Sequence, residues 1–117
     1  MDFTVEFYET RSGRCPVRDF LDDLKESDPD DFAAIIAGLA KLKNRTYHRP
    51  PLSKAIGDDL FELRHVGKLN TRVLYFFVKS HRIVAVHGIR SKASKILKQD
   101  RQVALERRLD WLRRHGE

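Results

Sequence analysis

Three short strand-like segments lie close together in the second half of the chain. They cover residues 60–64, 72–78 and 82–88. Gly67 and Asn70 mark a turn between the first two segments, and three residues join the last two. Turns this short impose antiparallel pairing, because a parallel connection needs a crossover of about a dozen residues or more. The sequence therefore predicts an antiparallel arrangement of these three strands.

Charged residues interrupt the apolar pattern of the first segment. Period-two alternation places Phe61 and Leu63 on one face of the strand and Glu62 and Arg64 on the other. An unpaired charge in a protein interior is strongly unfavourable. We therefore expect Phe61 and Leu63 to face the core, while Glu62 and Arg64 face outward towards a charged ligand.

The next two segments extend this expected surface. Arg72 opens the second segment, close enough across the short turn to neighbour Arg64, and His87 ends the third. A basic run follows directly, made of Arg90, Lys92, Lys95 and Lys98. We expect one carboxylate, one imidazole and several cations to converge on one open face of the sheet.

The remaining elements predict an α+β fold. Residues 3–8 alternate as in a half-buried strand, and Pro16 and Pro29 each suit a first helical position, with Asp28 able to cap the second helix. A last helix is expected over about residues 99–115, and the connection over residues 44–59 is expected to be irregular. The order β-α-α-β-β-β-α in a single domain, 1–117, predicts a small antiparallel-rich sheet with the helical hairpin packed on one face and a C-terminal helix. Tyr75 and Trp111 are expected to pack in the interior.

Positive charge is concentrated in the second half of the chain. The net charge of +6 divides into −2 for residues 1–53 and +8 for residues 54–117. A basic half suggests a polyanionic partner, nucleic acid first. A solvated basic surface without a partner is the alternative.

The composition also indicates where the chain works. No apolar stretch approaches the ~20 residues of a membrane-spanning helix, and the first residues lack the pattern of a signal peptide. Cys15 is the single cysteine, so no internal disulfide is expected. We expect a cytoplasmic protein.

A carboxylate, an imidazole and several cations suit RNA cleavage by the ribose 2′-hydroxyl. A base removes the hydroxyl proton, cations stabilise the charge on the phosphate, and an acid protonates the leaving oxygen. No cofactor is needed, and His81 and His87 lack the spacing of a paired metal site. A structural interpretation stays open beside this one: Glu62 in a cross-strand pair with Arg64 or Arg72, and His87 as a hydrogen-bonded core histidine.

The three segments resemble the phage-derived HigB-like branch of the RelE/ParE toxin superfamily. Residues 60–64 (LFELR), 71–76 (TRVLYF) and 83–88 (IVAVHG) stand where that branch has its three strand motifs, and a lysine-rich segment and a helix follow in the same order. The resemblance covers nearly the whole chain. It implies the toxin of a type II toxin–antitoxin system, a ribosome-dependent mRNA endonuclease (an mRNA interferase) that inhibits translation without metal.

The resemblance also implies site residues and partners. Glu62 is the candidate base, Arg72 a catalytic cation and His87 a weaker candidate acid. The implied RNA- and phosphate-binding residues are Lys54, Arg64, Arg90, Lys92, Lys95 and Lys98. The implied partners are a helix-turn-helix, HigA-like antitoxin, the ribosome and mRNA, with operator DNA contacted through the antitoxin complex.

The chain departs from the family pattern at a few positions. Ile96 and Leu97 replace the frequent Thr-Pro, Thr71 replaces an aromatic residue, and Ser91-Lys92 replaces a lysine pair. Two alternative functions therefore stay open: a ParE-like, non-enzymatic inhibitor of DNA gyrase, and an attenuated toxin that only binds its antitoxin. The combination of carboxylate, arginine and histidine favours the nuclease.

Overall fold

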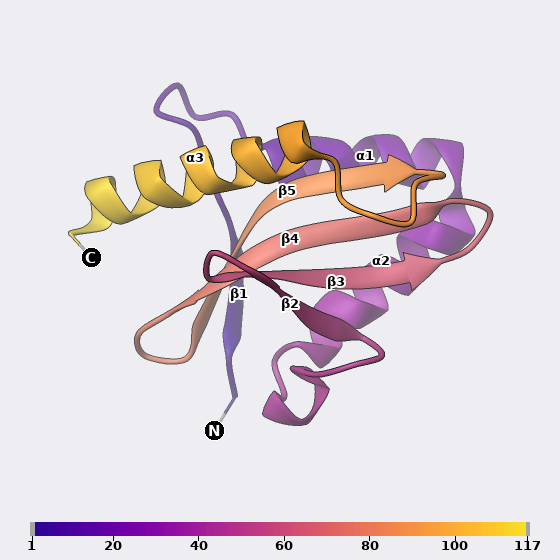
Figure 1. Ribbon diagram of the computed structural model, residues 1–117, viewed down its shortest axis with the longest axis horizontal. Helices are drawn as coiled ribbons and strands as arrows, with labels where there is room; N and C mark the ends of the chain where they lie inside the picture. Colours follow the sequence, from indigo (N-terminus) through magenta and orange to yellow (C-terminus); the bar gives the residue numbers. More distant parts are fainter. Residues whose placement is uncertain (1, 117) are drawn as a thin grey trace.

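A mixed β-sheet forms the centre of the protein, and helices cover both of its faces (Figure 1). The computed structural model describes residues 2–116. The strands are β1 (Thr4–Phe7), β2 (Ser53–Gly57), β3 (Leu60–Val66), β4 (Asn70–Val78) and β5 (Arg82–Ser91), in the sheet order β1-β5-β4-β3-β2. The helices are α1 (Pro16–Ser27), α2 (Pro29–Lys41) and α3 (Lys98–His115), with a short 3-10 helix, η1 (Arg45–Tyr47). The β1–β5 pair is parallel. The pairs among β3, β4 and β5 are antiparallel as predicted, and β2 also pairs antiparallel with β3.

The helical hairpin is confirmed and lies on one face of the sheet. Pro16 and Pro29 begin α1 and α2, and the Asp28 carboxylate accepts a hydrogen bond from the Asp31 backbone N–H at 3.2 Å. This interaction satisfies one of the free N–H groups at the start of α2. Leu63 and Tyr75 face this side and are fully buried, as predicted. Their packing partners from the hairpin include Val17, Leu21, Leu24, Ile35 and Leu39.

α3 covers the other face of the sheet, which corrects the expectation of one open face. Trp111 is buried as predicted, and its ring packs edge-on against Phe76 with centroids 5.7 Å apart. Further buried residues of this second core are Leu60, Leu74, Val84, Val86 and Ala104. These apolar side chains alternate along the strands with those of the first core, so both faces of the sheet needed a cover.

The connection over residues 44–59 contains an edge strand that the sequence prediction missed. β2 pairs with β3, with Lys54 opposite Glu62. The strands are joined by Asp58 and Asp59, whose φ angles are 56° and 61°. A two-residue turn with both φ angles positive matches the twist of a hairpin. Pro50, Pro51 and Gly57 had indicated an irregular connection, so the sheet has one strand more than predicted.

The segment between β5 and α3, here called the 92–97 loop, folds back towards the start of β4 (orange in Figure 1). The Asn70 side chain donates a hydrogen bond to the backbone carbonyl of Ala93 at 2.8 Å. This contact brings the lysine-rich segment beside the charged ends of β3 and β4. Within residues 2–116, no helix combines the length and the apolar character needed to cross a membrane.

Candidate functional site

A pocket of about 400 Å³ lies between β2, the 92–97 loop and the first turn of α3. The residues that line it are Lys54, Ala55, Ile56, Arg72, Ser94, Lys95, Ile96 and Arg101. Four of these eight residues are cations and none is a carboxylate. The described residues form no ion pair with Lys54 or Lys95. Such a surplus of positive charge suits an anionic ligand.

Arg72 is almost completely buried, with 1% of its surface exposed. Its Nη2 donates hydrogen bonds to the backbone carbonyls of Ser94 at 2.7 Å and Ala93 at 3.3 Å, which tie the 92–97 loop to the sheet. Its Nη1 is buried without a hydrogen-bond partner in the described part of the chain. A buried donor of this kind is costly unless a ligand satisfies it. Arg72 is therefore both a structural clamp and a candidate anion contact.

Glu62 does not face outward, and that expectation is wrong. Its surface is only 4% exposed, and its Oε2 lies 3.1 Å from Nε of Arg72. The two atoms form an ion pair, but their geometry is not that of a hydrogen bond. Neither atom therefore has a hydrogen-bond partner among the described residues. Burial is tolerated because each charge neutralises the other. The cross-strand pair left open by the sequence is thus present, and Glu62 lies behind Arg72 rather than in the pocket lining.

His87 is bound by two side chains of α3. Its Nε2 lies 2.8 Å from Oδ1 of Asp100, and its Nδ1 lies 3.2 Å from Nη1 of Arg107. A guanidinium can only donate, so Nδ1 accepts and Nε2 carries the proton donated to Asp100. Arg107 also donates to the Val86 carbonyl at 2.8 Å, and burial lowers the pKa of its guanidinium. His87 does not line the pocket, and its contacts dock α3 onto β5.

Arg90 lies on the opposite face of the sheet, away from the pocket. Its Nη2 contacts the carboxylates of Asp28 at 2.6 Å and Asp31 at 3.3 Å, where α1 meets α2. Asp31 also lies 3.2 Å from Nε2 of His65. The pKa of Asp28 is lowered, first by the hydrogen bond from the Asp31 backbone and further by Arg90. Arg90 therefore attaches β5 to the helical hairpin.

The other predicted phosphate-binding residues divide into two groups. Lys54 and Lys95 line the pocket. Arg64 stands directly opposite Arg72 in the sheet, as predicted, but is exposed outside the lining, like Lys92 and Lys98. These three residues extend the basic surface rather than the pocket.

Arg101 lines the pocket and was missed by the sequence interpretation. The available signal was the spacing of Lys98 and Arg101, three residues apart, which puts them on neighbouring positions of a helix. The basic run was read as ending at Lys98 because the residues that follow were assigned to a separate helix. The structure shows that the first turn of this helix belongs to the pocket wall.

Groups able to transfer protons are scarce in the pocket. Among the described residues, Ser94 supplies the one hydroxyl in its lining. Tyr75 is on the other face, where it hydrogen-bonds to Ser53, and burial raises the pKa of its phenol. Within residues 2–116, no group of three or more His, Cys, Asp and Glu side chains could hold a metal ion. Cations thus dominate the chemistry that the pocket itself offers.

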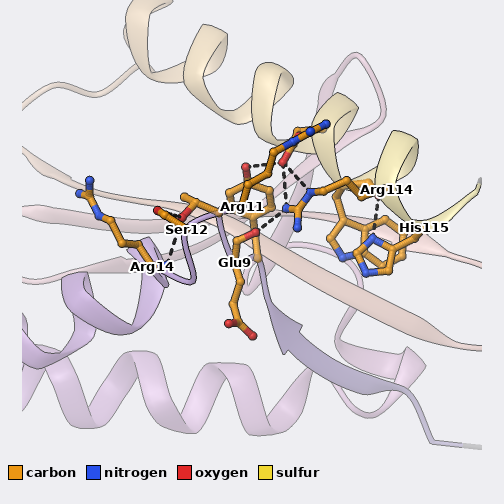
Figure 2. Close-up of polar contacts among 10 residues, drawn as sticks. Glu9, Arg11, Ser12, Arg14, Arg114 and His115 are labelled. Atoms are coloured by element: carbon orange, nitrogen blue, oxygen red, sulfur yellow. Dashed lines mark hydrogen bonds and ion pairs between the residues drawn. The ribbon is translucent and has the colours of Figure 1, made fainter.

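A second group of cations lies at the other end of α3. Asp110 accepts hydrogen bonds from the Tyr8 hydroxyl at 2.7 Å and from Nε of Arg114 at 3.0 Å, and Nε of Arg11 lies 3.4 Å from the same carboxylate. Figure 2 shows Arg114 reaching across to Glu9, to whose backbone carbonyl it also donates. Tyr8 and Arg114 thus fasten the end of α3 to the segment after β1, with a longer and more exposed contact from Arg11.

A family model described as Phage derived protein Gp49-like (DUF891) matches residues 19–109. The match runs from α1 through the first two thirds of α3 and includes every residue that lines the pocket. This family is of the RelE toxin type. No curated protein matches the chain.

Proposed function

Because the chain belongs to the Phage derived protein Gp49-like family, we propose that it is the toxin of a type II toxin–antitoxin system and an endoribonuclease that cuts mRNA on the ribosome. One observation carries the proposal. The buried guanidinium of Arg72 has an unsatisfied Nη1 and lines a pocket with three further cations. Such a site suits a phosphodiester, whose negative charge increases as its bond is attacked.

The proposed reaction needs no cofactor. The ribose 2′-hydroxyl gives up its proton to solvent as its oxygen attacks the neighbouring phosphorus, and the bond from phosphorus to the 5′-oxygen breaks as that oxygen takes up a proton. The products are a 2′,3′-cyclic phosphate and a free 5′-hydroxyl. Arg72, Lys54 and Lys95 bind the phosphoryl oxygens and stabilise their additional charge. Nη1 of Arg72 is the nitrogen available to these oxygens, because Nη2 is bound to the 92–97 loop and Nε faces Glu62.

We propose that Glu62 acts mainly by orienting Arg72. Its carboxylate contacts Nε of Arg72 and does not line the pocket. A general base must come within hydrogen-bond reach of the proton that it removes. A pH profile separates the two roles. If Glu62 is the base, Glu62→Gln slows cleavage by ~10²–10⁴-fold and removes the acidic limb of the profile. If it orients Arg72, the variant weakens RNA binding and the profile keeps its shape.

His87 receives a positioning role in this proposal. Its two ring nitrogens are occupied by Asp100 and Arg107, so it is not available to protonate a leaving oxygen. Lys54 and Lys95 are the groups in the pocket that can bring a proton to the 5′-oxygen.

We propose the partners that a toxin of this type requires. An antitoxin with a helix-turn-helix domain, HigA-like, neutralises the chain and gives it indirect contact with operator DNA. The ribosome presents the mRNA in the cytoplasm. The charge of +8 on residues 54–117 supports a polyanionic target.

The test is expression of the chain without an antitoxin, followed by mapping of RNA 5′ ends. We expect growth arrest and new 5′-hydroxyl ends within translated codons. The double variant Lys54→Ala/Lys95→Ala should lower the cleavage rate at least about tenfold. The matched control is Lys92→Ala/Lys98→Ala, which removes two exposed lysines that do not line the pocket. Equal losses in the two double variants would count against the pocket as the site.

A non-cleaving function is the second candidate, and one observation favours it. No carboxylate or imidazole lines the pocket, and Arg72 is engaged with the 92–97 loop. Normal growth on expression of the chain alone indicates an attenuated toxin that only binds its antitoxin. Growth arrest with intact transcripts and an induced DNA-damage response indicates a gyrase inhibitor.

A further inference from the structure

Arg101, which lines the pocket, takes part in an ion pair that the proposed reaction does not use. Nη1 of Arg101, in the first turn of α3, lies 3.5 Å from Oδ2 of Asp58 in the β2–β3 turn. Arg101 lines the pocket, whereas Asp58 does not. The guanidinium therefore stands between the carboxylate of Asp58 and the space in which a ligand phosphate would bind.

The contact between Arg101 and Asp58 is weak. Its separation is long for a charge-assisted hydrogen bond, and the two side chains are 32% and 59% exposed. Ion pairs exposed to this extent are screened by water and salt. A phosphate offers several acceptor oxygens to the same guanidinium, so it competes well for Arg101.

The same turn contains a second ion pair of nearly the same kind. Oδ2 of Asp59 lies 3.4 Å from Nη2 of Arg108, two helical turns after Arg101. Both carboxylates belong to the β2–β3 turn and contact arginines of α3. Arg108 does not line the pocket. The two pairs are similar in length and differ in whether the arginine borders the pocket, and Arg108 also lies over the ring of Phe76.

Buried Arg72 supplies an independent sign that this pocket takes an anion. Its Nη1 is buried and lacks a partner among the described residues. We propose that Arg101 is a further phosphate-binding residue of this site and that Asp58 occupies its guanidinium until a phosphate displaces it. That the natural ligand is an RNA phosphate rests on the proposed function. That Asp58 and an anion compete for Arg101 does not.

The proposal predicts opposite effects on binding for the two members of the pair. The probe is a short RNA oligonucleotide with every 2′-hydroxyl methylated, which cannot be cleaved, titrated into the full chain by calorimetry. Asp58→Asn should bind about threefold to fivefold more tightly, the range that a weak exposed ion pair corresponds to. Arg101→Gln should bind about tenfold more weakly and lower the salt slope by about one.

The second ion pair supplies the matched controls. Asp59→Asn changes the net charge by the same amount as Asp58→Asn, and Arg108→Gln by the same amount as Arg101→Gln. Both controls should leave the affinity within about twofold of the wild type, because neither residue borders the pocket. In the double variant Asp58→Asn/Arg101→Gln, the gain from removing Asp58 should disappear, because the two residues act on one contact. Circular dichroism checks that each variant is folded.

The possible outcomes separate this proposal from the proposed function. Equal affinities for the Asp58 and Asp59 variants, or unchanged affinity in Arg101→Gln, would overturn the competition. Failure of the wild type to cut unmethylated RNA, with the binding pattern intact, would overturn the nuclease and leave the role of Arg101 standing. If the wild type cuts unmethylated RNA but the variants do not show the expected binding pattern, the nuclease stands and the role of Arg101 is overturned.

Discussion

The two ends of α3 carry similar numbers of arginines and lysines but use them differently. At the C-terminal end, Arg114 and the nearby Arg11 contact Asp110, and Arg114 also binds a backbone carbonyl (Figure 2). At the N-terminal end, Arg101 has one long ion pair and Lys95 in the adjoining loop has none in the described structure. Arg114 is thus held by two acceptors of the protein, whereas Arg101 and Lys95, which border the pocket, keep donors for another molecule.

The helix dipole strengthens this contrast. The carbonyl end of a helix attracts cations, so Arg113, Arg114 and His115 in the last turn of α3 stabilise it. The amino end repels cations, yet Lys98 and Arg101 lie in the first turn, where helix stability favours acidic residues. The one acid of that turn, Asp100, is bound to His87. Positive charge at this end is therefore better explained by an anionic ligand than by the stability of α3.

The largest effect is expected at Arg72, which belongs to the pocket and also holds the 92–97 loop. Arg72→Lys keeps the charge but loses the planar fork, so RNA cleavage should fall by about 10²–10³-fold. Arg64→Lys is the control, because Arg64 stands opposite Arg72 in the sheet and does not line the pocket. Single-turnover cleavage and thermal unfolding are measured together. If unfolding explains the lost activity, Arg72 is a clamp alone.

An intermediate effect on stability is expected at Arg90, a cation whose ion pairs attach β5 to the helical hairpin. Arg90→Ala leaves the buried carboxylate of Asp31 without its guanidinium and should lower the free energy of unfolding by about 2 kcal/mol. Urea unfolding measures this change. RNA affinity under folding conditions should stay near the wild-type value, and a selective loss of affinity would return Arg90 to the RNA-binding surface.

The smallest effect is expected at Asp110, where the cations of the C-terminal end meet. The hydrogen bond from Tyr8 and the contacts with Arg114 and Arg11 hold the pKa of Asp110 below its ordinary value. A lowered folded-state pKa contributes stability above the ordinary value of about 3.9, and that stability is lost as the pH falls through the folded-state pKa. Asp110→Asn should therefore be less stable than the wild type at pH 7, and the difference should shrink towards pH 3.

Unfolding in guanidinium chloride at pH 7 and pH 3 measures the difference in stability between Asp110→Asn and the wild type. Asp23→Asn, at an exposed position of α1, is the control. A difference between Asp110→Asn and the wild type that is independent of pH would show that the carboxylate charge is not what fastens this end of α3.

Local pattern was sufficient to predict most elements of this fold. The prolines and the Asp28 cap located α1 and α2, and alternation in residues 60–64 placed Leu63 in the first core. The same alternation was misleading for Glu62, because a face assigned to solvent was covered by α3 and the 92–97 loop. Periodicity assigns a residue to a face of a strand, but it does not reveal what covers that face.

The same limit explains why some residues expected in the candidate site lie elsewhere. Lys54 and Lys95 could be found by resemblance, and Arg72 by its position at the head of an apolar strand. The partners of His87 and Arg90 could not, since Asp100, Arg107, Asp28 and Asp31 come from other elements. Whether a charged residue binds a ligand or stabilises the fold depends on these distant partners.

By itself, the sequence determined the helices, the antiparallel strands and the excess of positive charge in the second half of the chain. These depend on local propensity, short turns and composition, all of which are readable without distant contacts. Only the tertiary structure decided which cations are free to bind. Packing α3 against the sheet brings Arg107 to the Val86 carbonyl and Arg114 to the Glu9 carbonyl. It leaves Lys54, Lys95 and part of Arg72 around one pocket, because such contacts join residues far apart in the chain.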